Sequence, residues 1–295
     1  MDIRTALRQG IAQLRAAGVS SYTLAAELLL LHTLNRDRAW LYAHPEEVLN
    51  QATTEAYSGL IARRALGEPT QYLTGKQEFW SLDFEVNSDV LIPRPETEHV
   101  IEVALDRLAV RELRGGRPQK TNGEGLVIVD VGTGSGCIAV ALARELPGAT
   151  VYATDISPKA LSVAHRNAVR HNVAERIRFL HSNLLDAFRG QQRVLDLVAG
   201  NPPYIGLREK PGLDREVRDY EPPAALYGGE EGYELYAGLV GQAANYLKPE
   251  GVLVLELGYK TAPAVQPLLD TPDWNRAGVT NDLAGIPRIV AAERS

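Results

Sequence analysis

From Leu126 onward, short apolar segments alternate with segments of helical spacing. The apolar segments read LVIVDV, TVYATD, IRFLHS and VLDLVAG, and further on the helical segment ELYAGLVGQAANYL precedes the apolar segment GVLVLEL. Short apolar strands that alternate with helices are typical of βαβ units, which build a parallel sheet covered by helices on both faces. The pattern therefore predicts an α/β fold with a mostly parallel sheet.

The first part of the chain, residues 1–75, follows the period of an amphipathic helix instead. Apolar residues recur at spacings of three and four at Ile3, Leu7, Ile11 and Leu14, and again at Leu24, Leu28 and Leu31. This spacing predicts a small helical bundle.

The next segment, EFWSLDFEVNSDVLIP, shows partial period-two alternation around the turn-forming Asn87-Ser88-Asp89. We interpret it as a β-hairpin that joins two domains. We therefore expect a helical bundle over residues 1–75, a hairpin linker over 76–92 and an α/β domain over 93–295. Beyond Pro95 we expect a helix, followed by RGGRPQKTNGEG, which has the composition of a loop.

The composition limits the classes of function. The chain has 295 residues, 45% of them hydrophobic, and a formal net charge of −6 at pH 7. Proteins that bind phosphates for affinity usually carry a basic surface, so direct nucleic-acid binding is not expected. Cys137 is the single cysteine and the histidines lack metal-ligand spacing, so neither disulfides nor a metal site are expected. The longest apolar run, LAAELLLL, is too short to span a membrane, and a cytoplasmic protein is predicted.

A glycine-rich segment, VIVDVGTGSGCIAVALA, places Gly132, Gly134 and Gly136 at a strand-to-helix turn. Glycine permits positive φ and lets a ligand approach the backbone closely, and the helix start favours an anionic group. The dinucleotide fingerprint G-x-G-x-x-G requires a small residue where this chain has Cys137, which makes NAD the weaker interpretation.

Asp155 ends the next apolar segment, 19 residues beyond Gly136. A carboxylate at this position can accept hydrogen bonds from both hydroxyls of a ribose. Together with the glycine turn, it indicates an adenosine cofactor without a pyrophosphate, as in S-adenosyl-L-methionine. The alternative is that Asp155 only caps the helix that follows.

The tetrapeptide Asn201-Pro202-Pro203-Tyr204 directly follows the strand VLDLVAG, and ligands of open α/β sheets bind at the carboxyl ends of strands. Proline fixes φ and has no N–H, so the pair makes a rigid turn with available carbonyls. The Asn201 carboxamide and the Pro202 carbonyl can each accept one N–H of a planar amide or exocyclic amine, and so hold its nitrogen toward a methyl donor. Tyr204 can stack on the target group. The alternative is a turn with a packed tyrosine.

Six motifs make the chain resemble one family, the protein-(glutamine-N5) methyltransferases of the HemK or PrmC family, which modify class-I peptide-chain release factors. They are GEPTQYLTGKQEFW at 67–80, VLIPRPETE at 90–98, DVGTGSGCIAVALA at 130–143, NPPYI at 201–205, YEPPAALYGG at 220–229 and DLAGIPRIV at 282–290. The resemblance runs nearly from end to end.

The resemblance implies a Rossmann-like, seven-stranded class I S-adenosylmethionine-dependent methyltransferase domain, and a helical bundle that helps to dock the release factor. Its target is the glutamine of the factor's Gly-Gly-Gln loop. Asn201 would bind that amide, with Pro202, Pro203 and Tyr204 shaping the pocket. The residues that would bind the cofactor are Gly132, Thr133, Gly134, Ser135, Gly136, Asp155, Asn183, Leu184 and Asn201.

Two segments depart from the family pattern or remain open in role. The family commonly has an acidic residue at the position of Asn183, although an amide can also pair with an adenine edge. The PRPETE segment, Pro93–Glu98, resembles a wall near the cofactor and substrate, and it equally has the features of a helix start. The charged segment LREKPGLDREVRDYE is either a lid or a surface loop.

Other functions stay open at this point. The nearest is methylation of a ribosomal-protein glutamine, and a second is methylation of an adenine amino group in nucleic acid, which would use the same turn on a flipped base. A third is cofactor or partner binding without turnover. We expect a monomer that meets its protein substrate transiently.

Overall fold

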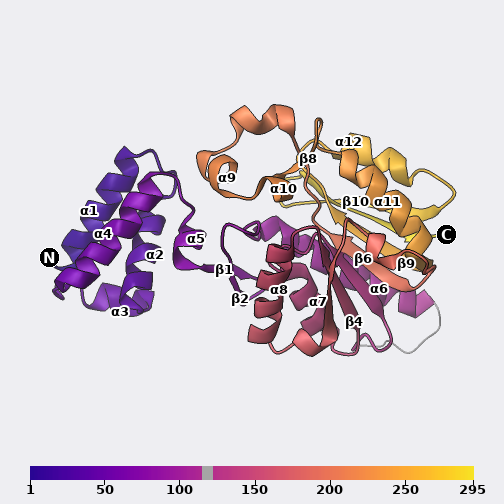
Figure 1. The fold of residues 1–295 in the computed structure, drawn as a ribbon, viewed down its shortest axis with the longest axis horizontal. Helices are drawn as coiled ribbons and strands as arrows, with labels where there is room; N and C mark the ends of the chain where they lie inside the picture. The colour runs from indigo at the N-terminus through magenta and orange to yellow at the C-terminus, as the bar shows by residue number, and fades with distance from the viewer. Residues whose placement is uncertain (115–121) are drawn as a thin grey trace. The chain divides into compact units, whose positions relative to one another are not determined.

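The computed structural model describes residues 1–114 and 122–295, and the chain divides into two compact units (Figure 1). The first unit comprises Met1–Lys76 and Leu213–Tyr220, and the second comprises Gln77–Gly212 and Glu221–Ser295. Most of the predicted loop RGGRPQKTNGEG, residues 115–121, lies outside the described residues. Of the helices in the described ranges, none combines the length and the apolar composition needed to cross a membrane.

The first unit is helical. Its elements are α1 (Ile3–Ala16), α2 (Tyr22–Leu34), α3 (Arg38–Ala43), α4 (Gln51–Ala65), α5 (Thr70–Thr74) and α9 (Arg215–Tyr220). Asp2, Asp37 and Asn50 cap α1, α3 and α4 by accepting backbone N–H groups with their side chains. The predicted helical bundle is confirmed.

The buried face of α2 differs from the predicted one. Leu24 and Leu28 are exposed, whereas Leu29 and Leu30 are fully buried. The reason is that α2 carries leucines around most of its circumference, so spacing alone does not decide which of them face the core.

The short helix α9 belongs to the helical unit, although residues 213–220 were assigned to the α/β domain from sequence. The buried Arg64 donates to the Glu216 carboxylate at 2.5 Å, and the Tyr220 hydroxyl donates to the Leu66 carbonyl at 3.1 Å. These long-range contacts have no counterpart in the local sequence pattern. The detailed domain boundaries over 1–75, 76–92 and 93–295 therefore stay a proposal.

A hairpin of β1 (Lys76–Phe79) and β2 (Leu82–Glu85) is present, but its turn is not the predicted one. Trp80 and Ser81 form the turn with φ of 54° and 57°, whereas the Asn87 side chain accepts from the Asp89 N–H in a separate turn. The Trp80 N–H donates to Glu98 at 2.7 Å and its indole N–H donates to Glu145 at 2.8 Å. Tertiary contacts thus place Trp80 in a conformation that favours glycine or asparagine. The role of the hairpin as a linker remains a proposal.

The second unit is built on a seven-stranded sheet with the order β10-β11-β9-β6-β3-β4-β5. Strands β3 (Val127–Val131), β4 (Thr150–Asp155), β5 (Ile177–His181), β6 (Leu195–Gly200) and β9 (Leu247–Glu256) are mutually parallel. On one side, β11 (Pro287–Arg294) pairs antiparallel with β9, and β10 (Trp274–Asn281) pairs antiparallel with β11. The predicted α/β fold with a seven-stranded sheet is confirmed.

Helices cover both faces of this sheet. The longer ones are α6 (Glu98–Arg114), α7 (Cys137–Glu145), α8 (Pro158–Arg170) and α11 (Glu234–Tyr246). The shorter elements are η1 (Pro95–Thr97), η2 (Ala174–Arg176), η3 (Asp186–Phe188), η4 (Leu207–Gly212), α10 (Pro223–Leu226), α12 (Ala262–Val265) and η5 (Gln266–Leu269), with a small sheet of β7 (Ile205–Gly206) and β8 (Tyr227–Gly229).

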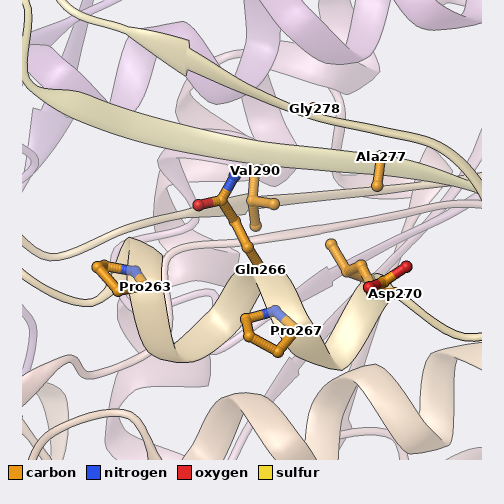
Figure 2. Close-up of a pocket in the computed structure, with 8 residues that line it drawn as sticks. Pro263, Gln266, Pro267, Asp270, Ala277, Gly278 and Val290 are labelled. Carbon is orange, nitrogen blue, oxygen red and sulfur yellow. The ribbon is translucent and has the colours of Figure 1, made fainter.

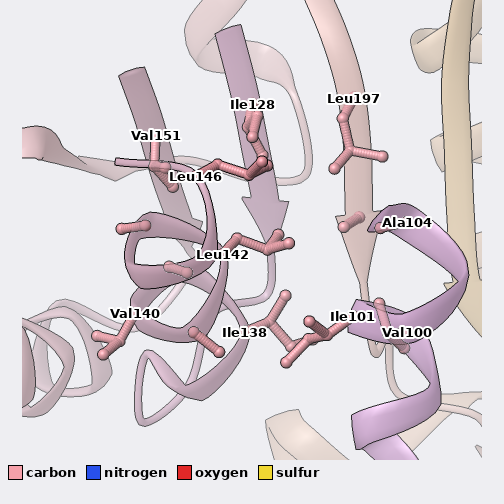
Figure 3. Packing of buried hydrophobic residues seen from close by; sticks show 14 of the residues in the cluster. Val100, Ile101, Ala104, Ile128, Ile138, Val140, Leu142, Leu146, Val151 and Leu197 are labelled. Atoms are coloured by element: carbon pink, nitrogen blue, oxygen red, sulfur yellow. The ribbon is translucent and has the colours of Figure 1, made fainter. Parts of the chain in front are cut away.

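The core consists of two layers that follow the strand period of two. Ile128 and Leu197 pack with Ile138 and Leu142 of α7 on one face (Figure 3). Their neighbours Val129 and Val198 pack on the other face with α11. Because the chain runs from β3 to β5 in one direction and places β6 on the other side of β3, the sheet has its switch point between β3 and β6. The loops after these strands are therefore the expected ligand site.

Candidate cofactor and substrate pocket

A pocket of about 270 Å³ lies at the carboxyl ends of the parallel strands. Loops that follow β3, β4, β5 and β6 contribute to its lining. Eight residues predicted from sequence line this one pocket: Gly132, Gly134, Asp155, Asn183, Leu184, Asn201, Pro202 and Pro203. The fold thus brings the glycine turn and the Asn-Pro-Pro-Tyr motif to one place.

The three glycines of the turn have two different roles. All have positive φ, at 72° for Gly132, 54° for Gly134 and 82° for Gly136. A Cβ on Gly132 would meet no heavy atom within 4 Å, and one on Gly134 would meet only a carbonyl oxygen at 3.9 Å. A Cβ on Gly136 would lie 3.0 Å from the Cβ of Ala164. The first two glycines therefore leave open space for a ligand, and the third permits close packing against α8.

Thr133 and Ser135 are buried between these glycines, and the described pocket lining includes neither. The Thr133 hydroxyl donates to Asp130 at 2.6 Å, and the same Asp130 oxygen accepts from the Ala139 N–H at 3.1 Å. Burial raises the pKa of Asp130 to about 7. Asp130 thereby ties the glycine turn to the start of α7, and any cofactor contact of Thr133 or Ser135 would involve the backbone.

Asp155 braces the glycine turn from the end of β4. One of its carboxylate oxygens accepts from the Gly134 N–H at 2.9 Å and the other accepts from the Ser157 N–H at 2.8 Å. Burial raises the pKa of this carboxyl above its usual value. The helix cap is Ser157, whose hydroxyl accepts from the Ala160 N–H. A capping role therefore does not explain Asp155, which lines the pocket.

The Asn-Pro-Pro-Tyr motif forms a turn after β6, and its residues face two different sides. Asn201 and the two prolines line the pocket, and the Asn201 carboxamide N–H donates to the Thr97 hydroxyl at 3.1 Å. The Tyr204 hydroxyl instead donates to Glu256 at 3.3 Å. Burial raises the pKa of Tyr204 well above its usual value. Because Tyr204 faces Glu256, its stacking on a target group stays a prediction.

Two residues lie behind the motif, namely Thr97, which belongs to the PRPETE segment, and Glu256, which no sequence motif predicts as functional. Both are buried and joined by a hydrogen bond of 2.6 Å from the Thr97 hydroxyl to the Glu256 carboxylate. A usable signal exists for Glu256, since it ends a parallel strand beside β6 in an otherwise apolar segment. The same rule that located Asn201 could have located it.

The PRPETE segment has both features expected of it. It forms a helix start, with η1 leading directly into α6. Arg94 also pairs with the buried Glu221 at 2.5 Å, next to Pro222, which lines the pocket. The pocket wall itself is formed by the preceding residues, Asp89–Leu91. The role of this segment as a wall therefore stays a prediction, now with Arg94 as its connection to the pocket.

The backbone of the motif lies directly against two glycines of the YGGEEG segment. A Cβ on Gly228 would lie 2.2 Å from the Pro203 carbonyl oxygen, and one on Gly232 would lie 2.3 Å from the Tyr204 carbonyl oxygen. No side chain fits at either position without moving the backbone of the motif. The family motif YEPPAALYGG thus contributes a surface that holds the Asn-Pro-Pro-Tyr turn.

Gly228→Ala is expected to lower both stability and activity for this reason. Overpacking of a well-packed site typically costs about 1–3 kcal/mol, and here the clash falls on the backbone next to Pro202. Urea denaturation measures the first effect and a methyl-transfer assay the second. The control is Gly212→Ala, where an added Cβ meets no atom within 4 Å. Wild-type stability and rate in Gly228→Ala would show that the turn adapts freely.

A second hollow, of about 440 Å³, lies between the segment of α12 and η5 and the strands β10 and β11 (Figure 2). Pro263, Gln266 and Pro267 face it from one side, and Val290 and Ala277 from the other. Asp270 is the one ionisable residue among its described lining, which shares no residue with the first pocket. It offers no pair of groups suited to methyl transfer.

In the described part of the chain, no cluster of three histidine, cysteine or acidic residues could hold a metal ion.

Comparison with solved structures identifies the class of fold. A methyltransferase from Pyrococcus furiosus has a TM-score of 0.51 at 17% identity, with 80% of this chain and 98% of that chain covered. The N-terminal domain of human METTL16 in complex with SAH has a TM-score of 0.50 at 19% identity, with 79% and 81% covered. The second unit therefore has a methyltransferase fold.

Sequence comparison identifies the family. Residues 5–75 match the model of the PrmC N-terminal domain, and residues 119–211 match that of the methyltransferase small domain. The release factor glutamine methyltransferase of Koribacter versatilis is 43% identical over 100% of this chain and 99% of its own length. That of Nitratidesulfovibrio vulgaris is 41% identical over 98% of this chain and 94% of its own length. The chain belongs to the release factor glutamine methyltransferase family, as its motifs predicted.

Proposed function

We propose that this chain transfers the methyl group of S-adenosyl-L-methionine to the side-chain amide nitrogen, N5, of the glutamine in the Gly-Gly-Gln loop of class-I peptide-chain release factors. The observation that carries the proposal is that Asn201 and Pro202 line the same pocket as Gly132, Gly134 and Asp155. The names of the relatives that match end to end support the choice of substrate.

The residues of the pocket fit the cofactor. Gly132 and Gly134 present backbone to open space, where the methionine end can approach closely. The Asp155 carboxylate lies at the edge of the same pocket and suits the ribose hydroxyls, while Asn183 and Leu184 suit the adenine. When bound, the cofactor supplies a methyl group activated by a sulfonium centre.

Asn201 and Pro202 position the acceptor. The lone pair of an amide nitrogen is delocalised, so the reaction depends on holding the nitrogen with its out-of-plane face toward the methyl group. The Asn201 carboxamide oxygen and the Pro202 carbonyl each accept one N–H of the glutamine amide. Orientation of this kind can contribute several kcal/mol, on the order of 7 or more in well-oriented reactions. The methylated amide nitrogen carries the positive charge and is strongly acidic, so it releases one proton to water without a strong base.

The helical unit is proposed to help dock the release factor, as the resemblance implies for residues 1–75. We further propose that the enzyme acts as a cytoplasmic monomer that meets its protein substrate transiently, without direct contact to nucleic acid. The net charge of −6 supports a protein partner over a polyanion.

The substrate assignment is tested with a panel. Purified enzyme is incubated with methyl-labelled cofactor and, separately, with release factor, ribosomal protein and a single-stranded adenine-containing oligonucleotide. Label on release factor alone is the expected result. Label on ribosomal protein or on adenine would retain the cofactor assignment and overturn the substrate, and cofactor binding without any transfer would favour the non-enzymatic alternative.

A further inference from the structure

A buried chain of hydrogen bonds runs from Glu256 to the pocket. The Glu256 carboxylate accepts from the Thr97 hydroxyl at 2.6 Å, and the Thr97 oxygen accepts from the Asn201 carboxamide N–H at 3.1 Å. Glu256 is 1% exposed and Thr97 is 2% exposed, whereas Asn201 lines the pocket. Asn201 is thus the pocket end of a chain whose other members are removed from solvent.

The chemistry of these groups gives the chain a direction. A carboxylate can only accept hydrogen bonds, and a hydroxyl has one proton to donate. Because the Thr97 hydroxyl donates its one proton to Glu256, it presents only lone pairs to Asn201. The group that faces Thr97 must then be the NH₂ of the carboxamide, and the carbonyl oxygen, Oδ1, is the group left for the pocket. This settles an orientation that shape alone does not distinguish.

We propose that Glu256 is a positioning residue that fixes, through Thr97, the orientation of the Asn201 carboxamide, so that Oδ1 accepts an N–H of the substrate amide. This inference rests on the proposed function. Neither Glu256 nor Thr97 is expected to touch the substrate. They determine that the oxygen of the Asn201 carboxamide, and not its NH₂ group, faces the substrate.

Besides Thr97, two groups keep Glu256 in place. Its second carboxylate oxygen accepts from the Tyr204 hydroxyl at 3.3 Å, and its backbone carbonyl accepts from the Tyr236 hydroxyl at 2.7 Å. Tyr204, the last residue of the motif, is therefore bonded to the same carboxylate that orients Asn201, the first residue. The buried Glu256 carboxylate is thus linked by hydrogen bonds to both ends of the Asn-Pro-Pro-Tyr turn, directly to Tyr204 and through Thr97 to Asn201.

Protonation of Glu256 would reverse the chain. Burial raises the pKa of Glu256 to about 7. A protonated Glu256 can donate to Thr97, whose own proton then turns toward Asn201, so that Oδ1 faces Thr97 and the NH₂ faces the pocket. Two donors would then oppose each other at the substrate amide. The titratable and charged groups around Glu256 are Glu96, Cys137, Tyr204, Tyr236 and Arg288.

The pH profile of kcat/KM is therefore expected to have an acidic limb. As pH falls through about 7, the proportion of enzyme with an accepting Oδ1 decreases, and kcat/KM decreases with it. The pH profile of kcat/KM reports ionisation of the free enzyme, before substrate binds. In Glu256→Gln the group no longer titrates, so this limb is expected to disappear.

Thr97→Val removes the hydroxyl that joins Glu256 to Asn201 while it retains the shape of the side chain, and Thr97→Ser retains the hydroxyl. We expect Thr97→Val to lower kcat by up to about 100-fold, because misplacement of a positioning group by an ångström has effects of that size. Cofactor affinity, measured by calorimetry, should change far less. Thr97→Ser should restore most of the rate. Equal rates in Thr97→Val and wild type, with the acidic limb retained in Glu256→Gln, would overturn the inference.

The side-chain NH₂ signals of Asn201 in ¹⁵N-labelled enzyme test the orientation without any substrate. Asn201→Asp assigns them by their loss. In the wild type their chemical shifts are expected to change as the pH passes through about 7, where Glu256 titrates. In Glu256→Gln the chemical shifts should no longer depend on pH in this range. In Thr97→Val they should differ from the wild-type values. Signals indifferent to pH and to both substitutions would overturn the inference even if release factor is methylated. If release factor is not methylated but the signals respond as described, the orientation stands and the proposed substrate fails.

Discussion

Asn201→Ala is expected to lower kcat for methyl transfer by on the order of 100-fold to 1000-fold, the range seen when one preorganised hydrogen-bonding group is removed from an active site. In the proposed mechanism the substitution deletes the oxygen that accepts one N–H of the glutamine amide, so the nitrogen would no longer be held toward the methyl group. It also leaves the Thr97 hydroxyl without the donor that it has at 3.1 Å. Cofactor affinity should fall much less, because the glycine turn and Asp155 are unchanged.

The control for this substitution is Asn245→Ala. Asn245 is an exposed residue of α11 whose side chain bonds to the Gly241 carbonyl of the same helix. Single-turnover kinetics with saturating cofactor separate the chemical step from binding. A wild-type rate in Asn201→Ala would contradict the assignment of this residue to the acceptor amide.

The second large effect is expected for Gly134→Val, which should weaken cofactor binding by on the order of 100-fold or more. The added carbons would occupy the open space of the pocket, since only the Gly132 carbonyl oxygen lies within 4 Å of a Cβ at this position. Forcing carbons into a site that a ligand fills typically costs about 1–3 kcal/mol, and the lost contacts add to this. Isothermal titration with the cofactor measures the effect directly.

A matched control separates this effect from backbone strain. Gly190 has φ of 85°, is exposed, and has no atom within 4 Å of a built Cβ. Gly190→Val therefore carries a comparable left-handed strain of about 1–2 kcal/mol, outside the pocket. Equal cofactor affinity in Gly134→Val and Gly190→Val would show that the glycine turn is not the cofactor site.

Much of the fold could be predicted from sequence because its signals are local. The apolar segments of the sheet, such as VIVDV and LDLVAG, are followed by glycine or by a polar residue, and their alternation with helices restricts the topology. The pocket could be predicted because Asp155 ends β4 and Asn201 directly follows β6, and the carboxyl ends of parallel strands meet at one edge. These rules need no knowledge of long-range contacts.

The features that sequence did not give depend on contacts far along the chain. Trp80 adopts positive φ because Glu98 and Glu145 bind its two N–H groups, and a local turn rule cannot anticipate them. Likewise, the association of residues 213–220 with the helical unit depends on Arg64 and Tyr220. Glu256 ends a strand beside β6, but its connection to Asn201 through the Thr97 hydroxyl is a three-dimensional contact that no local pattern shows.

Locating the methyl group on the product tests the proposed reaction and its target. Release factor is incubated with the enzyme and labelled cofactor, digested, and mapped by tandem mass spectrometry, beside a release factor whose Gly-Gly-Gln glutamine is replaced by alanine. We expect a single methyl group on the side-chain amide of that glutamine, and none on the replaced factor. A methyl group on any other residue, or equal labelling of the replaced factor, would contradict it.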